Sequence, residues 1–396
     1  MSALVANGAL PRHGAEAIAS DAPAVLARAR TFHTLDALRG VAAVVVLFFH
    51  AAFFYGIAAP AEGYIAVDLF FVMSGFIIAY RYEDDLRHGL RVRGFMAIRL
   101  IRLYPLFLLG TLLGVVSAVV AVASGRADAA HRGLVESLPL AVFLLPSRFA
   151  MAHLTEFYPL NYVSWSLALE ILVNLAYAAT YRVWTNGRLA VLVAIGFVGL
   201  CAAAAAYGSL NIGYDWGNWI GGLPRILFGF ALGILLFRRY AARPFKPRVP
   251  WWLPVVLVPA AFFFDPGSLH VAGLKPVWDV VLVTVFVPAI VIAAIGREPP
   301  KAAQGICALA GVFSYVLYSL HAPCVGLFLR AEDRLHLDVT TTSPGKAIVL
   351  TVFLVAACLI GHFAYDKPVR SRLTRLRTAW RLGTRQDSAA VAPRRG

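Results

Sequence analysis

The sequence predicts an all-α membrane protein, a polytopic bundle of ten transmembrane helices with one short re-entrant or interfacial segment. Three observations predict it: 60% of the 396 residues are apolar, only 14% are charged, and the mean hydropathy is +0.72. This composition excludes an ordinary soluble protein of this length. Ten apolar stretches approach the roughly 20 residues needed to cross a hydrocarbon core. They are 36–58, 64–80, 103–123, 163–181, 189–208, 219–237, 251–264, 278–296, 306–329 and 346–364.

One further apolar run, 138–145, is too short to cross and is bracketed by Pro139 and Pro146, so we interpret it as the re-entrant or interfacial segment. Short loops rich in Lys and Arg stay cytoplasmic. With ten crossings, most of the 36 Lys and Arg residues fall on one side of the membrane. The pattern predicts a cytoplasmic N-terminal tail at 1–34, a transmembrane domain at 35–366 and a basic cytoplasmic C-terminal tail at 367–396.

Charge and cysteine content exclude several other classes of protein. The net charge of +15 follows from this topology and from attraction to anionic lipid headgroups, so we do not predict nucleic-acid binding. Residues 1–34 have no apolar core directly after a basic start and do not resemble a cleaved signal peptide. The four cysteines show no CxxC spacing, which indicates packing rather than disulfide, metal or redox chemistry, and we predict no metal site.

The first predicted span, 36–58, places Arg39 and His50 on one helix face. They are eleven residues apart, which is three turns plus about 20°, and about 16 Å along the axis. Asp36 precedes Arg39 by three residues. The arrangement suits an anion at the cytoplasmic mouth and acid–base chemistry deeper in the bilayer. The alternative is structural: His50 bonds a neighbouring helix and Arg39 reaches the headgroups.

Further polar residues interrupt the later spans, and a charged group at mid-membrane indicates function because it is costly there. Asp68 lies one heptad before Gly75 and either faces an outer vestibule or pairs with a neighbour. Glu170, five residues after the interfacial Trp165, must find a partner on another helix, stay protonated or line water, and Arg225 is the candidate partner.

Two more pairs lie at helical spacing. Arg99 and Arg102 share one face near the cytoplasmic end of their span, where arginine can bind the phosphates of a donor such as coenzyme A or simply anchor the helix. Tyr318 and His321 share a face in the tenth span, followed by Pro323.

Five segments in this order resemble the motifs of the acyltransferase-3 family of integral membrane O-acyltransferases, in the form without a fused esterase-like domain. The resemblance covers residues 32 to 370. TLDALRGVAAVVVLFFH is similar to the family's Arg-x10-His signature, and VDLFFVMSGFIIA, which includes Ser74, to its second-helix motif. The others are RLIRLYP, WSLALE and SYVLYSLHAP, while Asp366-Lys367-Pro368 departs from the family's Glu-Lys/Arg-Pro element.

The resemblance implies an enzyme of the bacterial cytoplasmic (inner) membrane that transfers an acetyl group from cytoplasmic acetyl-CoA to a hydroxyl of a cell-surface or lipid-linked glycan. It implies catalysis by His50, Arg39 and Glu170 and binding of the acyl-CoA donor by Arg39, Arg99 and Arg102. Further polar positions for the substrate or the structure are Asp36, Asp68, Ser74, Trp165, Arg225, Tyr318 and His321. Either an acyl-histidine relay or direct transfer fits, and the oligomeric state stays open.

Three alternatives remain at this point. A proton-coupled transporter would use Asp68, Glu170 and His321 as a relay, although the chain lacks an evident internal repeat. An acyltransferase could instead act on a secondary-metabolite or glycolipid hydroxyl. A different class of membrane-bound O-acyltransferase is the third.

Overall fold

The computed structural model describes residues 30–123, 137–147, 156–335 and 342–390, with residues 380–390 described by backbone alone. Residues 30–32 belong to a separate unit, Met1–Phe32, and all that follows concerns the unit His33–Gly396. The predicted tail at 1–34 therefore lies almost entirely outside the described residues.

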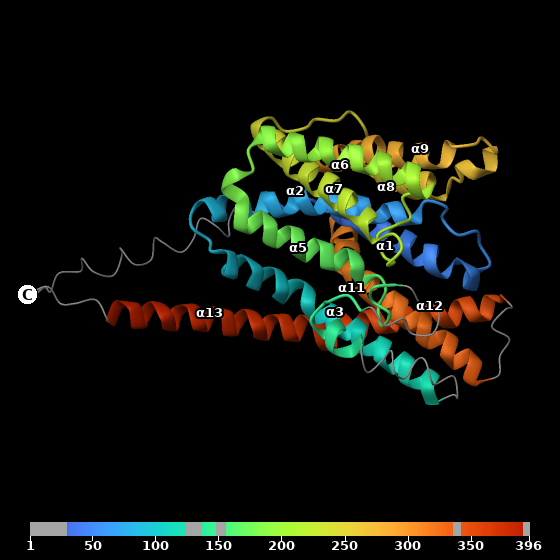
Figure 1. Cartoon of the computed structure of the whole chain (residues 1–396). Coiled ribbons are helices and arrows are strands. Elements are labelled where there is room, and N and C mark those ends of the chain that lie inside the picture. Colours follow the sequence, from blue (N-terminus) through green and yellow to red (C-terminus); the bar gives the residue numbers. More distant parts are fainter. Residues whose placement is uncertain (1–29, 124–136, 148–155, 336–341, 391–396) are drawn as a thin grey trace, which may run out of the picture. The chain divides into compact units, whose positions relative to one another are not determined.

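The regular secondary structure in the described part of that unit is helical, apart from one isolated β-bridge between Glu156 and Asp215 (Figure 1). Two π-helical segments, Leu282–Phe286 and Gly361–Asp366, join α9 to α10 and α12 to α13 without a loop. The helices are α1 (His33–Ala51), α2 (Ala66–Arg87), α3 (Val92–Ala123), α5 (Ser164–Thr180), α6 (Asn186–Tyr207), α7 (Gly222–Ala242), α8 (Trp252–Phe263), α9 (Leu274–Val281), α10 (Val287–Gly296), α11 (Lys301–Arg334), α12 (Pro344–Ile360) and α13 (Lys367–Ala390).

Each of the ten predicted spans coincides with a helix, and the prediction of an all-α membrane bundle is confirmed. Among the described residues, eight helical segments are long and apolar enough to cross a membrane. The two predicted spans that miss this criterion are α5, with 17 residues, and α8, with 12. At a rise of about 1.5 Å per residue, α8 alone is shorter than a bilayer core.

The ends of α8 nevertheless lie at opposite ends of α1. Before α8, the backbone oxygen of Pro247 accepts a hydrogen bond of 2.8 Å from Arg297, whose own carbonyl bonds Thr34 at the start of α1. At the other end of α8, the carbonyl of Phe262 accepts a 2.9 Å bond from the backbone of Glu62, in the segment after α1. With its flanking residues, α8 therefore runs the length of α1.

The basic loops meet at one end of the bundle, which we call the basic end, formed by residues 87–93, 181–188, 238–248 and 297–301. Arg238 ties three of its helices together through Glu83 at 3.0 Å and the carbonyl of Trp184. The segments 52–63, 142–147, 156–163, 208–221 and 264–274 form the opposite end. These four basic loops therefore lie at the same end of the bundle.

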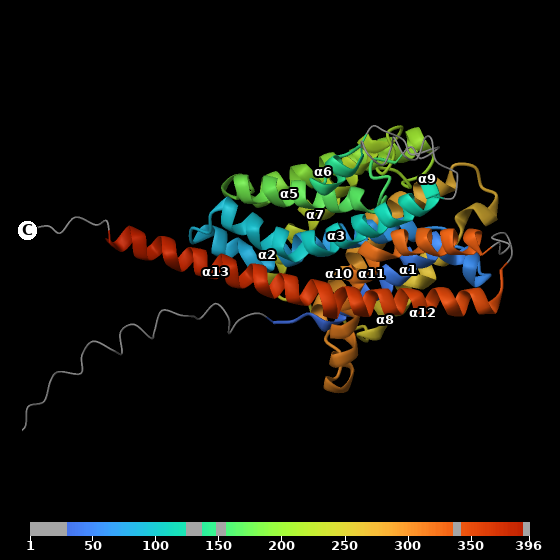
Figure 2. The same ribbon diagram turned by 90° about the horizontal axis from the view of Figure 1, so that it is seen from below.

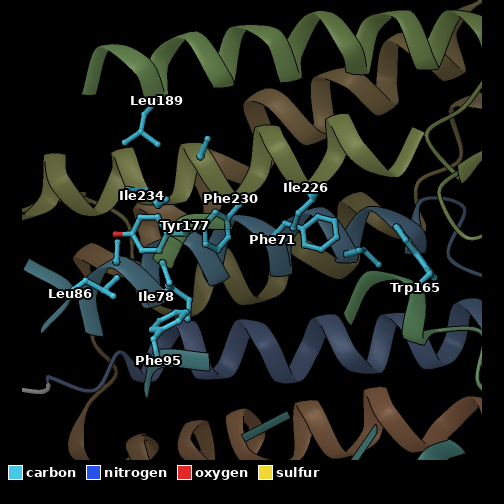
Figure 3. Close-up of a cluster of buried hydrophobic side chains, with 14 of the residues drawn as sticks. Phe71, Ile78, Leu86, Phe95, Trp165, Tyr177, Leu189, Ile226, Phe230 and Ile234 are labelled. Carbon is cyan, nitrogen blue, oxygen red and sulfur yellow. The ribbon is translucent and has the colours of Figure 1, made fainter. Parts of the chain in front are cut away.

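Close helix contacts position the interior polar residues. α1 packs mainly on α11, and α2 mainly on α7. Gly75 lies against the Phe230 backbone, where a Cβ would come within 2.1 Å of the carbonyl oxygen. Figure 3 shows the adjoining core, in which aromatic rings such as Phe71, Tyr177 and Phe230 fill the space beside α2 and α7. This pairing of α2 and α7 also brings Asp68 to Arg225.

Two segments outside the ten spans are also described. The run 138–145 contains helical turns that end in a turn at Phe143–Leu144, as expected for a segment that does not cross. The predicted basic tail at 367–396 begins as helix α13, which continues from α12 and extends beyond the neighbouring helices (Figures 1 and 2). Residues 391–396 lie outside the described residues.

Candidate active site

A cavity of about 130 Å³, which we call the inner cavity, lies among α1, α2, α3, α5 and α11. Arg39, Arg99 and Arg102 all line it, so two distant segments of the sequence bring three guanidinium groups to one site. Arg102 is exposed and marks the mouth of the cavity, whereas Arg99 is buried. The predicted common face of Arg99 and Arg102 is thus directed at the inner cavity.

Glu170 lines the same cavity, and its partner is Arg99. The Arg99 Nη2 lies 3.1 Å from Glu170 Oε1, which also accepts hydrogen bonds from Ser74 Oγ at 2.5 Å and from Asn174 at 3.3 Å. The expected pairing of Glu170 with Arg225 is wrong. Because α2 packs against α7, Arg225 pairs with Asp68 of α2 instead.

Asp68 and Arg225 form a fully buried ion pair outside the inner cavity. Arg225 donates two bonds to Asp68, at 3.1 Å from Nε to Oδ1 and 2.6 Å from Nη2 to Oδ2, and it also donates to the carbonyls of Ile212 and Tyr64. The Trp165 ring lies 5.3 Å from its guanidinium carbon. All three nitrogens of the guanidinium donate hydrogen bonds, and the pair joins α2 to α7. Of the two expectations for Asp68, the pairing with a neighbour is correct.

Arg39 lines the cavity without a fixed partner, unlike Arg99. Within the described residues its guanidinium makes no hydrogen bond and no ion pair, and Asp36 and Glu170 act on it only through their charge. Asp36 itself packs against Gly311 of α11. A cation held in an apolar bundle without a direct partner is suited to an anionic ligand.

His50 lies outside the inner cavity. It lines a second cavity of about 350 Å³, which we call the outer cavity, towards the opposite end of the bundle. The His321 ring stacks on the His50 ring with centroids 5.4 Å apart, and Tyr162 meets His50 edge-on at 5.0 Å. His321 Nδ1 lies 3.0 Å from the carbonyls of Leu317 and Tyr318, so this nitrogen carries the proton in the neutral ring. Its Nε2 is buried with no bond within the described residues.

Tyr318 separates the two cavities. Tyr318 and Val67 line both, so the inner and outer cavities adjoin. The Tyr318 hydroxyl lies 2.6 Å from Ser166 Oγ and 3.2 Å from the carbonyl of Val163, which fixes the ring across the junction. The cavity lined by Arg39, Arg99 and Arg102 and the cavity lined by His50 therefore share a wall at Val67 and Tyr318.

Several polar residues near the outer cavity were absent from the sequence prediction. Lys275 pairs with Glu62 and, at 3.2 Å, with Asp279, and the Tyr64 hydroxyl bonds both carboxylates. Burial raises the pKa of Glu62, which lies outside the membrane spans, to about 7 despite its bonds from Lys275 and Tyr64. The i,i+4 spacing of Lys275 and Asp279 is typical of an ion pair on one helix and could have indicated this pair. Both residues, however, lie at the edge of the predicted span 278–296.

Comparisons with known proteins agree on one family. A family model described as an acyltransferase domain matches residues 32–363. The chain is 35% identical over 185 residues to Protein 2 in picA locus of Rhizobium radiobacter. The aligned region covers 44% of this chain and 96% of that protein. It is also 29% identical over 361 residues to BcsY of Komagataeibacter xylinus, which is named as a membrane-bound transacylase. This alignment covers 84% of this chain and 82% of BcsY. No solved structure shows a significant match.

Proposed function

We propose a reaction for the two cavities from the premise that this chain belongs to the acyltransferase-3 family and is a multi-pass membrane acyltransferase. The reaction is transfer of an acetyl group from cytoplasmic acetyl-CoA to a hydroxyl of a cell-surface or lipid-linked glycan. In this proposal the basic end and both termini face the cytoplasm of a bacterial inner membrane, in accord with the rule for Lys and Arg.

One observation carries the proposal: three arginines line the inner cavity at the basic end, and this cavity adjoins the outer cavity that His50 lines. Arginine binds phosphate bidentately, so Arg39, Arg99 and Arg102 would hold the phosphates of the donor. The extended pantetheine arm would then direct the thioester along α1 past Tyr318 towards His50. Glu170 acts by orienting Arg99, to which it is bonded.

His50 is suited to proton transfer in this reaction. It accepts the proton of the acceptor hydroxyl, whose oxygen forms the ester bond to the acyl carbon as the C–S bond breaks. The coenzyme A thiolate leaves and takes the proton back from His50, so the enzyme ends unchanged. Histidine is the side chain that exchanges a proton most readily near neutral pH.

Binding of coenzyme A to the purified full-length protein in lipid nanodiscs tests the donor assignment. We expect saturable binding that weakens as salt rises, because phosphate contacts to arginine are screened. A proton-coupled transporter would show no such binding, and its absence in the wild-type protein would contradict the proposal. Mass spectrometry of surface glycans from a deletion strain, searched for a lost acetyl mass, tests the acceptor.

A further inference from the structure

The outer cavity carries polar groups that the acyl donor does not use. Besides His50 it is lined by the carboxylate of Glu156, the amide of Asn211 and the phenol rings of Tyr162 and Tyr214. These residues come from two loops at the opposite end of the bundle, 156–162 and 210–218, neither of which carries a family motif. None of them lines the inner cavity, where Arg39, Arg99 and Arg102 lie, and Arg225, which also lines the outer cavity, is paired with Asp68.

Glu156 lines this cavity and has a buried carboxylate oxygen. Its Oε2 is buried and makes no hydrogen bond within the described residues. Its charge acts on two neighbouring hydroxyls: burial, followed by Glu156, raises the pKa of Tyr162, and burial, Asp215 and Glu156 together raise the pKa of Tyr214. The carboxylate therefore lies close to both rings, with acceptor capacity to spare.

The two loops hold Glu156 in a rigid frame. The backbone of Phe157 donates a 3.1 Å bond to the carbonyl of Tyr214, beside the bridge between Glu156 and Asp215. The Asn218 side chain accepts bonds from the backbones of Gly213, at 2.8 Å, and Asp215. Gly213 has φ +107°, and a Cβ there would lie 2.9 Å from the Trp165 ring, so the loop requires glycine at this position. The site is formed without a ligand.

This combination of groups fits a polyhydroxylated ring. A carboxylate accepts hydrogen bonds from adjacent hydroxyls, a primary amide both donates and accepts, and aromatic rings cover the apolar faces. The Asn211 side chain makes no hydrogen bond within the described residues and is available as well. An apolar alcohol would leave Glu156 buried and unpaired, which is costly.

We propose that Glu156 is the specificity-determining residue of the acceptor site, binding the sugar hydroxyls next to the one that reacts at His50, with Asn211 as a second contact. The proposal rests on the proposed acetyl transfer and adds the residue that selects the acceptor. Glu156 contacts only the acceptor. It has no role in donor binding, which takes place on the other side of Tyr318.

The test compares the wild-type protein with Glu156→Gln, which keeps the shape and removes the charge. Purified full-length protein in nanodiscs is given radiolabelled acetyl-CoA with methyl β-D-glucopyranoside, N-acetylglucosamine or cyclohexanol as the acceptor probe. We expect acetylation of a sugar and none of cyclohexanol. Glu156→Gln is expected to raise the KM for the sugar by at least about tenfold, as for loss of a charged hydrogen bond, with coenzyme A binding unchanged.

The matched control is Asp265→Asn, which neutralises an exposed carboxylate at the same end of the bundle and keeps its bond to the Gly267 backbone. This variant is expected to retain the wild-type KM. The acceptor assignment is overturned if Glu156→Gln keeps the wild-type KM, or if the wild-type protein binds coenzyme A but acetylates neither sugar or acetylates cyclohexanol as well. Failure of the wild-type protein to bind coenzyme A would overturn both the proposed function and the acceptor assignment.

Discussion

Arg99 and Arg102 lie three residues apart and have different environments. Arg99 is 6% exposed and bonded to Glu170, so it is fixed within the bundle. Arg102 is exposed at the mouth of the inner cavity and has no hydrogen bond or ion pair within the described residues. The first is therefore part of the structure as well as the site, whereas the second is free to meet a phosphate.

Replacing Arg102 with glutamine separates donor binding from folding. Loss of one charged contact to phosphate is expected to weaken coenzyme A binding by about tenfold or more, with an unchanged unfolding temperature. Titration calorimetry across a salt series measures the affinity. The control is Arg182→Gln, which removes an exposed charge at the basic end away from the cavity. Equal affinities of the Arg102 and Arg182 variants for coenzyme A would show that Arg102 does not bind the donor.

The buried pair of Asp68 and Arg225 predicts a stability effect. Asp68→Leu leaves the guanidinium buried and uncompensated, which is expected to cost about 3–5 kcal/mol of unfolding free energy. The double variant Asp68→Leu/Arg225→Leu is expected to recover part of this loss. Unfolding in detergent monitored by tryptophan fluorescence measures both, with the exposed Asp84→Asn as a neutral control. A single variant as stable as the wild-type protein would show that the pair does not hold α2 to α7.

At the scale of elements, the contact between α2 and α7 depends on glycines. Gly75 of α2 and Gly233 of α7 each lie against the partner's backbone, where a Cβ would come within 2.1 and 2.2 Å of a carbonyl oxygen. Gly75→Val is expected to force the helices apart, at a cost of about 1–3 kcal/mol or more. Gly187→Ala, at an open position, is the control. Retained thermal stability of Gly75→Val would contradict this packing.

Helix α8 makes a prediction about topology. Its C-terminal end bonds the segment after α1, so residue 269 is expected on the opposite side of the membrane from residue 243, although α8 has only 12 residues. Alkaline phosphatase, active only outside the cytoplasm, is expected to be active when fused after Leu269 and inactive after Arg243. Equal activities at the two positions would mean that α8 does not cross.

At the scale of the whole molecule, the spans and the motif residues could be predicted from the sequence, because both depend on patterns among residues close together in the chain. Apolar runs set the ten helices, and the 11-residue spacing of Arg39 and His50 set their common face. Partners across helices could not be predicted in the same way. Asp68 rather than Glu170 meets Arg225, since the glycines of α2 and α7 set the rotation of those helices about each other.

Residues in loops were the least accessible to prediction. Glu156 and Asn211 carry no periodic signal and meet only because the backbones of two distant loops pair. His321, by contrast, was singled out from its motif, but its stacking on His50 depends on how closely α1 and α11 pack. The motifs therefore indicate the chemistry, while the fold indicates which cavity each motif residue serves.

The central claim is that His50 carries out proton transfer between a donor held at the basic end and an acceptor in the outer cavity. The most direct test is transfer of labelled acetyl from acetyl-CoA to the acceptor in membranes of a deletion strain, by purified His50→Ala. We predict wild-type insertion and coenzyme A binding with no acetyl transfer, while the control Cys324→Ala, in the core beside α12, keeps nearly full activity. Full activity of purified His50→Ala would contradict the account.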